Sequence, residues 1–398
     1  MIHRDAESLV LRRAQSLPVV TITGPRQAGK TTLCRRVFSD KPYVSLEAPD
    51  ERARAQADPR EFLRSFPEGA VLDEVQRVPE LLSYLQGIVD EHNRPGEWVL
   101  TGSSNFALLA SVSQSLAGRT ALVNLLPLSW AEIERFDRQP ADLTQAMVTG
   151  GFPRIHEQRL TPNEWISDYV STYLERDVRQ LIQVADLARF QDFIRHCAAR
   201  SGQLLNLSAL GADCGISHHT AKSWLGVLEA SFLVFQLPPV HRNLRKRLTR
   251  TRKLYFGDTG LLCWLLGIER PDQLTRHPLR GAIFETWVVS EIVKARTHAG
   301  LTTNGAGGLR FYRDQAGLEV DVVLENPGKI LAVECKAGTT IASDALNGLR
   351  RFSELINKRD PEHPEVSSRL VYGGDEGYVR EGVELIPWRS LGQSDWGG

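Results

Sequence analysis

The chain has 398 residues, of which 42% are hydrophobic and 24% are charged, a composition typical of a folded globular protein with two or three domains. Lysine plus arginine equals aspartate plus glutamate at 48 each, so any attraction to nucleic acid has to come from a local patch. The five cysteines lack C-x-x-C spacing, the N-terminus is charged and no apolar run is as long as a membrane span. These features disfavour zinc sites, disulfide frameworks and membrane insertion, and favour a cytoplasmic location.

Residues 18 to about 125 alternate short apolar runs with segments of helical spacing. This alternation is typical of βαβ units, in which helices cover both faces of a parallel sheet. The predicted strands are 19–23, 43–46, 70–73, 98–101 and 121–125, and the predicted helices are 30–38, 79–92 and 105–116. The first third of the chain is therefore predicted to be an α/β core.

A phosphate-binding loop joins the first predicted strand to the first predicted helix. Residues 24–31 read G-P-R-Q-A-G-K-T, the complete pattern G-x-x-x-x-G-K-T. The glycines let backbone N–H groups face a phosphate, Lys30 would hold the β- and γ-phosphates, and Thr31 would bind Mg²⁺. The flanking strand and helix favour a nucleoside triphosphate site over an ordinary glycine-rich turn. The predicted ATP-binding residues of the loop are Gly24, Pro25, Arg26, Gln27, Ala28, Gly29, Lys30, Thr31 and Thr32.

Two acidic residues, Asp73 and Glu74, end the third predicted strand. Asp73 would bind Mg²⁺ through its water shell, and Glu74 would polarise the water that attacks the γ-phosphate. A carboxylate pair can also simply cap the end of a strand. The phosphate-binding loop upstream favours the catalytic interpretation and predicts hydrolysis in addition to binding.

Small polar residues follow the fourth predicted strand, and an arginine precedes the fifth. Ser103 and Asn105 could sense the γ-phosphate, while Ser104 or Asn105 could equally cap the next helix. Arg119 could supply positive charge to the transferred phosphoryl group, in cis or from a neighbouring subunit. A single arginine is more often an ordinary surface residue.

Helices dominate after Pro127, at 164–183, 187–201, 207–214 and 219–231. Residues 206–229 have the shape of a helix-turn-helix that would offer His219, Lys222 and Ser223 to a groove. Segments 232–237 and 253–257 predict a two-stranded wing, and the run 242–253 between them is densely basic. It could neutralise nucleic-acid phosphates, or be the solvated loop of a protein-interaction module.

The pattern becomes mixed again from residue 281, with strands predicted at 309–313, 318–324, 330–335 and 370–372. A turn at Pro327 and Gly328 joins the second of these strands to the third. A register symmetric about that turn places Asp321 opposite Glu334 and Glu319 opposite Lys336, all on one face.

These residues predict a second site. Asp321 and Glu334, with Glu285 from the predicted helix 282–289, would bind Mg²⁺ or Mn²⁺, and Lys336 would position a water for phosphodiester hydrolysis. The alternative is a satisfied cluster of ion pairs without a metal.

The chain resembles a family along nearly its whole length. The motifs that carry the resemblance are residues 24–32, 72–74, 100–105, 116–119, 127–132, 150–153, 173–177, 257–261, 284–285, 319–321 and 334–336. They are similar to bacterial and archaeal AAA-type ATPases that carry a C-terminal domain like PD-(D/E)xK nucleases, although Glu319-Val-Asp321 lacks the literal Pro-Asp. The resemblance implies an ATPase domain at 1–135, a winged-helix domain at 136–257 and a nuclease-like domain at 258–398.

We expect from these features a Mg²⁺-dependent ATPase whose nucleotide state moves a winged-helix and nuclease-like module on DNA or RNA, as a monomer or an oligomer. The alternative is a nucleotide-dependent protein-interaction switch with an inactive nuclease-like domain. A small-molecule kinase is disfavoured, because Glu74 stands where a water-activating residue belongs and most of the chain lies beyond the core.

Overall fold

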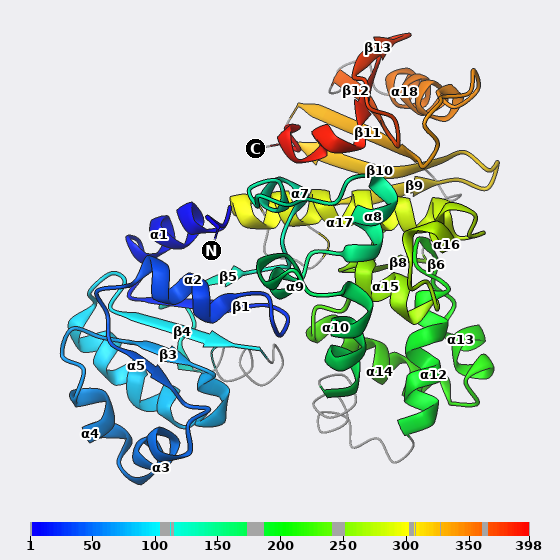
Figure 1. Cartoon of the computed structure of the whole chain (residues 1–398). Helices are drawn as coiled ribbons and strands as arrows, with labels where there is room; N and C mark the ends of the chain where they lie inside the picture. The colour runs from blue at the N-terminus through cyan, green and yellow to red at the C-terminus, as the bar shows by residue number, and fades with distance from the viewer. Residues whose placement is uncertain are drawn as a thin grey trace. The chain divides into compact units, whose positions relative to one another are not determined.

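The computed structural model describes residues 2–103, 112, 115–172, 187–240, 251–301, 306, 308–326, 328–359 and 365–397 (Figure 1). The chain divides into two compact units. The N-terminal unit comprises Met1–Leu128, Ala230–Phe232 and Thr297–Thr303, and the second unit comprises Ser129–Glu229, Leu233–Arg296 and Asn304–Gly398.

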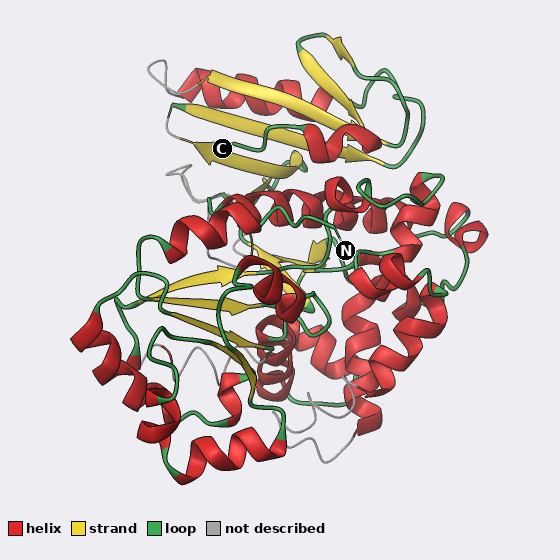
Figure 2. Cartoon of the chain, turned by 60° about the vertical axis from the view of Figure 1, so that its left-hand side comes forward, coloured by secondary structure: helices red, strands yellow, loops and turns green. Residues whose placement is uncertain are grey.

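A five-stranded sheet forms the centre of the N-terminal unit, and all of its strand pairs are parallel (Figure 2). Its order is β2-β3-β4-β1-β5, so β4 lies between the strand before the phosphate-binding loop and the strand that ends in Asp73. The five predicted strands of the α/β core are confirmed, with their ends shifted by at most one residue, and the helix predicted at 79–92 begins two residues later, at Leu81. The strands are β1 Val19–Thr23, β2 Tyr43–Ser45, β3 Val71–Asp73, β4 Trp98–Gly102 and β5 Thr120–Asn124.

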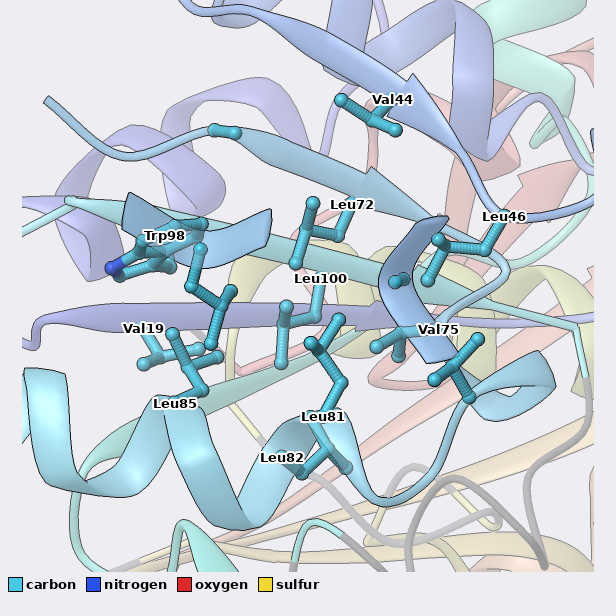
Figure 3. Close-up of a cluster of buried hydrophobic side chains, with 14 of the residues drawn as sticks. Val19, Val44, Leu46, Leu72, Val75, Leu81, Leu82, Leu85, Trp98 and Leu100 are labelled. Atoms are coloured by element: carbon cyan, nitrogen blue, oxygen red, sulfur yellow. The ribbon is translucent and has the colours of Figure 1, made fainter. Parts of the chain in front are cut away.

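Helices bury apolar side chains against both faces of this sheet. Figure 3 shows one face, where Leu81 of α5 approaches Leu100 of β4 and Leu85 of α5 approaches Val19 of β1. On the other face, Leu33 of α2 joins a core with Val20 and Ile22 of β1. The helices of this unit are α1 Glu7–Ala14, α2 Lys30–Val37, α3 Pro49–Ala57, α4 Pro59–Arg64 and α5 Leu81–His92, with a 3-10 turn at Val75–Arg77. Most of the helix predicted at 105–116 lies outside the described residues.

The first half of the second unit is mainly helical, as predicted. A small antiparallel sheet of order β6-β8-β7 accompanies its helices, made of Gln203–Leu204, Lys253–Phe256 and Val234–Leu237 in that order. The hairpin of β7 and β8 confirms the pair of strands predicted there. The helices are α7 Trp130–Ile133, α8 Leu143–Thr149, α9 Pro153–Gln158, α10 Pro162–Tyr169, α12 Leu187–Ala198, α13 Leu207–Asp213, α14 His218–Ala230, α15 Thr259–Leu265 and α16 Pro271–Thr275.

The remainder of the second unit is a mixed six-stranded sheet of order β13-β14-β12-β11-β10-β9. The antiparallel pairing of Val322 with Val333 continues to Asn326 with Lys329, which confirms the predicted hairpin and its register. Leu349 and Phe352 of α18 pack into the core of this sheet. The elements are α17 Arg280–Ala299, β9 Arg310–Arg313, β10 Glu319–Asn326, β11 Lys329–Lys336, α18 Asn347–Arg359, β12 Glu365–Tyr372, β13 Tyr378–Arg380, β14 Val383–Pro387 and a 3-10 helix Trp388–Gln393.

Candidate nucleotide site and carboxylate cluster

The phosphate-binding loop depends on two glycines with positive φ. Gly24 has a φ of 149°, and a Cβ atom there would lie 2.0 Å from the carbonyl oxygen of Leu125. Gly29 has a φ of 93° and immediately precedes α2. Larger residues would be strained at both positions, so the loop can wrap closely around a ligand only with glycine there.

Lys30 is buried in this loop and 7% exposed. Its Nζ donates to the carbonyl oxygens of Gly24, at 2.9 Å, and Pro25, at 2.8 Å. Burial lowers the pKa of Lys30 to about 8, although the nearby Glu74 and Asp73 oppose this effect. The amine is thus a buried cation held by neutral carbonyl groups, a setting in which an added phosphate would be a better partner.

Asp73 is buried and collects hydroxyl groups from three elements. Thr31 Oγ1 of α2 donates to Asp73 Oδ2 at 3.0 Å, and the Tyr43 hydroxyl of β2 donates to the same oxygen. Thr101 of β4 donates to the other oxygen, Oδ1. Burial and the bond to Asp73 raise the pKa of Tyr43 above its ordinary value. Hydroxyl and carboxylate oxygens are the donors that Mg²⁺ prefers, so Thr31 and Asp73 fit that ion.

Glu74 has a left-handed backbone, with φ 56° and ψ 43°. Its Oε2 atom accepts hydrogen bonds from the Gln76 side-chain amide and from the Ser103 hydroxyl, the latter at 3.1 Å. A left-handed non-glycine residue costs about 1 kcal/mol or more, and such strain clusters at functional sites. Ser103 was expected to contact the γ-phosphate. Its hydroxyl instead donates to Glu74, the carboxylate that is expected to activate the attacking water. Ser104 and Asn105 lie outside the described residues.

Arg119 lies at the amino-terminal end of the parallel strands, opposite the end that carries the phosphate-binding loop. Its carbonyl oxygen accepts from the Val19 amide at the start of β1, at 3.2 Å, whereas the phosphate-binding loop follows the end of that strand. Five residues at about 3.3 Å each separate the two ends by roughly 16 Å. The guanidinium pairs with the Asp90 carboxylate, with Nη2 2.8 Å from Oδ2. The structure does not bring Arg119 to the loop of its own chain.

Two contributors to this site were missed in the sequence. Arg4, which is buried, donates to the carbonyl oxygens of Ala28 in the loop, at 2.7 Å, and of Leu126, at 2.8 Å. Tyr43 reaches Asp73 because β2 lies next to β3 in the sheet. The strand order that brings them together is a long-range property, and the only local signal was a tyrosine at the start of a short predicted strand.

The predicted C-terminal residues gather around a lysine that was not predicted there. Lys253, the first residue of β8, has a side chain that is 3% exposed. Its Nζ lies 2.9 Å from Glu285 Oε1, 2.7 Å from Glu319 Oε1 and 3.7 Å from Asp321 Oδ1. Tyr255 of the same strand donates its hydroxyl to Glu285 Oε1 at 2.6 Å. Lys253 ends the basic run 242–253, which was predicted to face solvent or nucleic acid, but its side chain is buried. Residues 242–250 of that run lie outside the described residues.

Charge and burial act on this cluster in opposite ways. Burial disfavours the ammonium form of Lys253, but the carboxylates of Glu285, Asp321 and Glu319 outweigh it and raise its pKa above the ordinary value. Burial and the neighbouring Asp321 raise the pKa of Glu285 to about 7. Lys253 therefore stays charged, whereas the neighbouring carboxylate of Asp321 disfavours ionisation of Glu285.

Glu334 and Lys336 lie at the end of β11, beside this cluster. Lys336 Nζ donates to Glu334 Oε1 at 2.6 Å, and the Cys335 amide donates to Asp321 Oδ2 at 2.9 Å. Burial and Asp321 raise the pKa of Glu334 to about 8. Within the described residues, no group of three or more His, Cys, Asp or Glu side chains is arranged to hold a metal ion. The predicted residues are adjacent, but they are arranged around amines.

The helix-turn-helix segment has one buried and one exposed face. Asn206 caps α13 by accepting from the amides of Ser208 and Ala209. Leu225 and Leu228 of α14 are buried, whereas Lys222 on the same helix is exposed together with His219 and Ser223. Across the part of the chain that the structure describes, no helix is long and apolar enough to cross a membrane.

The sequence matches three domain families in succession. The AAA domain family matches residues 16–134, a domain of unknown function (DUF8612) matches residues 140–272, and another (DUF4143) matches residues 280–391. The chain is 34% identical over 344 residues to the uncharacterized proteins Rv2008c of Mycobacterium tuberculosis and Mb2031c of Mycobacterium bovis. Each alignment covers 85% of this chain and 74% of the relative.

Solved structures give more distant similarities. The Walker-type ATPase PABY2304 of Pyrococcus abyssi is 16% identical, with a TM-score of 0.44, over 67% of this chain and 96% of that protein. AMPPCP-bound DnaA from Aquifex aeolicus is 14% identical, with a TM-score of 0.32, over 57% of this chain and 89% of that protein.

Proposed function

This chain belongs to the family of these two mycobacterial proteins, and on that premise we propose that its AAA domain binds ATP with Mg²⁺ and hydrolyses it. The observation that carries the proposal is the convergence of Lys30, Thr31, Asp73 and Glu74 at one edge of one sheet. A domain match supports nucleotide binding, while the acidic pair supports hydrolysis.

The side chains would divide the reaction as follows. Lys30 would exchange its two carbonyl partners for oxygens of the β- and γ-phosphates, and Thr31 and Asp73 would hold Mg²⁺. When bound, Mg²⁺ neutralises charge that develops on the phosphates. Glu74, held by Ser103 and Gln76, would orient the attacking water and accept its proton.

The test is ATP turnover by Glu74→Gln and Lys30→Ala variants. Loss of a positioned general base costs roughly 10²- to 10⁴-fold, so E74Q should retain ATP binding and lose at least about 100-fold in turnover. K30A should lose both. Lys329→Ala, at an exposed lysine of β11, is the matched control and should behave as wild type. Wild-type turnover by E74Q would refute the assignment.

A second proposal concerns the helix-turn-helix segment. The succession α12, β6, α13, α14, β7, β8, with β7 and β8 as a hairpin, supports a winged-helix segment that contacts DNA or RNA through the exposed face of α14. We propose that nucleotide state alters this contact, and that the chain has the three predicted domains 1–135, 136–257 and 258–398. A protein-interaction module of the same shape is the competing proposal.

Fluorescence anisotropy with a labelled DNA duplex separates these two. If α14 contacts phosphates, binding should weaken steeply between 50 and 200 mM salt, because roughly one counterion is released per contact. The double variant His219→Ala/Lys222→Ala should then bind more weakly than wild type, whereas Lys329→Ala should not. Equal binding by both variants would remove α14 from the proposal. Cleavage by the Glu285, Asp321, Glu334 and Lys336 group stays a prediction that requires a divalent ion in the place of Lys253 Nζ. It is tested by comparing DNA and RNA integrity with wild type and Asp321→Ala in Mn²⁺.

A further inference from the structure

We propose that the ammonium group of Lys253 is the resident cation of the carboxylate cluster formed by Glu285, Glu319 and Asp321, and that this cluster takes no divalent metal ion while Lys253 is in place. The proposal concerns the second unit alone and does not depend on ATP hydrolysis by the AAA domain.

The first argument is the position of Nζ. It lies 2.9 Å from Glu285 Oε1 and 3.7 Å from Asp321 Oδ1, between carboxylates contributed by α17 and β10. A divalent cation binds carboxylate oxygens at about 2.0 to 2.6 Å, so an ion shared by these two side chains would need the volume that Nζ fills. The lysine and the metal ion are alternatives for one place.

The second argument is the way the amine is held. Lys253 and Tyr255 are two residues apart on β8, so both side chains point to the same face of the strand, and both contact Glu285 Oε1. Nζ also lies 5.5 Å from the centroid of the Phe311 ring. A side chain with two close carboxylate partners, an aromatic neighbour and almost no exposure is built into the cluster rather than resting against it.

The third argument is charge. Four carboxylates meet here, and they are faced by three cations: Lys253, Lys336 at 2.6 Å from Glu334, and Arg313 at 3.3 Å from Glu319. Adding a divalent ion beside Lys253 would place two cations in contact in a buried setting, which is strongly unfavourable. Removing the lysine would leave excess negative charge that a divalent ion could neutralise.

The lysine also stands at a place from which it can be withdrawn. Lys253 is the first residue of β8 and pairs with the end residues Leu204 of β6 and Leu237 of β7, while the carbonyl oxygen of the preceding Arg252 accepts from the Leu205 amide at 2.8 Å. Its displacement would break terminal pairs of a small sheet and leave the remaining pairs of β8 intact. The cluster would then be a metal site that opens only when the start of β8 moves.

Mn²⁺ binding to the full chain, counted by electron paramagnetic resonance without nucleotide, tests this. Asp321→Asn keeps the shape of the side chain and should leave wild-type Mn²⁺ binding unchanged. The double variant Lys253→Gln/Glu319→Gln removes one charge of each sign and should bind one more Mn²⁺ ion than wild type. Adding Asp321→Asn to this double variant should abolish binding of the extra ion. Asp73→Asn identifies any ion held at the phosphate-binding loop, so failure of the ATPase proposal would show separately.

Two outcomes would overturn the proposal. One is a loss of bound Mn²⁺ in wild type on introducing Asp321→Asn, because the cluster would then hold metal with Lys253 in place. The other is a double variant that binds no additional Mn²⁺ ion although it is folded, as shown by far-ultraviolet circular dichroism and ATP turnover that match wild type. If the double variant does not fold, the comparison of wild type with Asp321→Asn decides alone.

Discussion

The two units each hold a buried lysine beside acidic residues, yet the two lysines are in opposite electrostatic states. Both hydrogen bonds of Lys30 go to backbone carbonyls, and burial lowers its pKa to about 8. Lys253 lies among three carboxylates that raise its pKa despite burial. The charge of Lys30 is only weakly compensated, so this lysine can bind an incoming anion. The charge of Lys253 is already compensated by the neighbouring carboxylates. The partners of a buried lysine, rather than its presence, indicate whether a site is open to a ligand.

The largest expected effect is on the loop that holds Lys30. Gly24→Ala would place a Cβ atom 2.0 Å from the Leu125 carbonyl oxygen at a φ of 149°, so the loop must shift and we expect no measurable ATP binding and a clearly lower melting temperature. Gly87→Ala is the control, because it lies in α5 with no atom near the new Cβ, and should stabilise by about 0.5 to 1 kcal/mol. Titration with a fluorescent ATP analogue and thermal melting check both; normal binding by G24A would contradict the loop geometry.

The next effect contrasts the two lysines directly. Lys253→Met leaves buried carboxylates without their cation, and removing one partner of such a pair costs about 3 to 5 kcal/mol. Lys30→Met removes a charge whose burial is only weakly compensated, and should cost less than about 1 kcal/mol or stabilise the chain. The urea concentration at the midpoint of each tryptophan-fluorescence transition measures the difference. Equal losses for the two variants would break the comparison.

A smaller effect is expected at Tyr43, whose hydroxyl holds Asp73 Oδ2. Groups that hold a metal ligand typically change metal affinity by about 10-fold or more, so Tyr43→Phe should raise the Mg²⁺ concentration for half-maximal ATP turnover roughly tenfold. The rate at saturating Mg²⁺ should change little. Tyr84→Phe, at an exposed tyrosine of α5, serves as the control. An unchanged Mg²⁺ requirement would remove Tyr43 from the site.

The smallest effect is expected at Arg119, which is paired with Asp90 on the surface. An exposed ion pair is screened by solvent and contributes little to stability, so Arg119→Ala should alter the unfolding midpoint only slightly. Because its own loop lies at the other end of the strands, turnover of the isolated chain should stay within about twofold of wild type. A larger fall that depends on protein concentration would instead place Arg119 in the site of a neighbouring copy.

Local chemistry explains what the sequence could predict. The strand β1 and the start of α2 were located to the residue, because the apolar run ends directly before the pattern G-x-x-x-x-G-K-T, whose lysine begins the helix. The helices α3 and α4 were missed, although Pro49 and Pro59 begin them and Asp58 caps α4, because α3 has too few apolar residues to show a helical stripe. Caps were the more informative local signal there.

Long-range contacts explain what could not be predicted. The hairpin turn gave the register that brings Asp321 beside Glu334, but nothing in the sequence between residues 253 and 321 indicates that Lys253 enters the same cluster. The resemblance to the family also did not indicate what each shared motif does. Gly151 and Asp258 belong to motifs shared with the family, and the structure gives them a structural role: the Asp258 carboxylate caps α15 and accepts from the Gly151 amide at 2.7 Å.

The most direct test of the contrast between the two lysines is the anomalous scattering of a wild-type crystal soaked in Mn²⁺ and a non-hydrolysable ATP analogue. We predict a manganese peak beside Thr31 and Asp73, with Lys30 turned to the phosphates, and no peak between Glu285 and Asp321, where Lys253 Nζ should keep its carboxylate partners. A manganese peak bridging Glu285 and Asp321, with Lys253 displaced, would contradict the account.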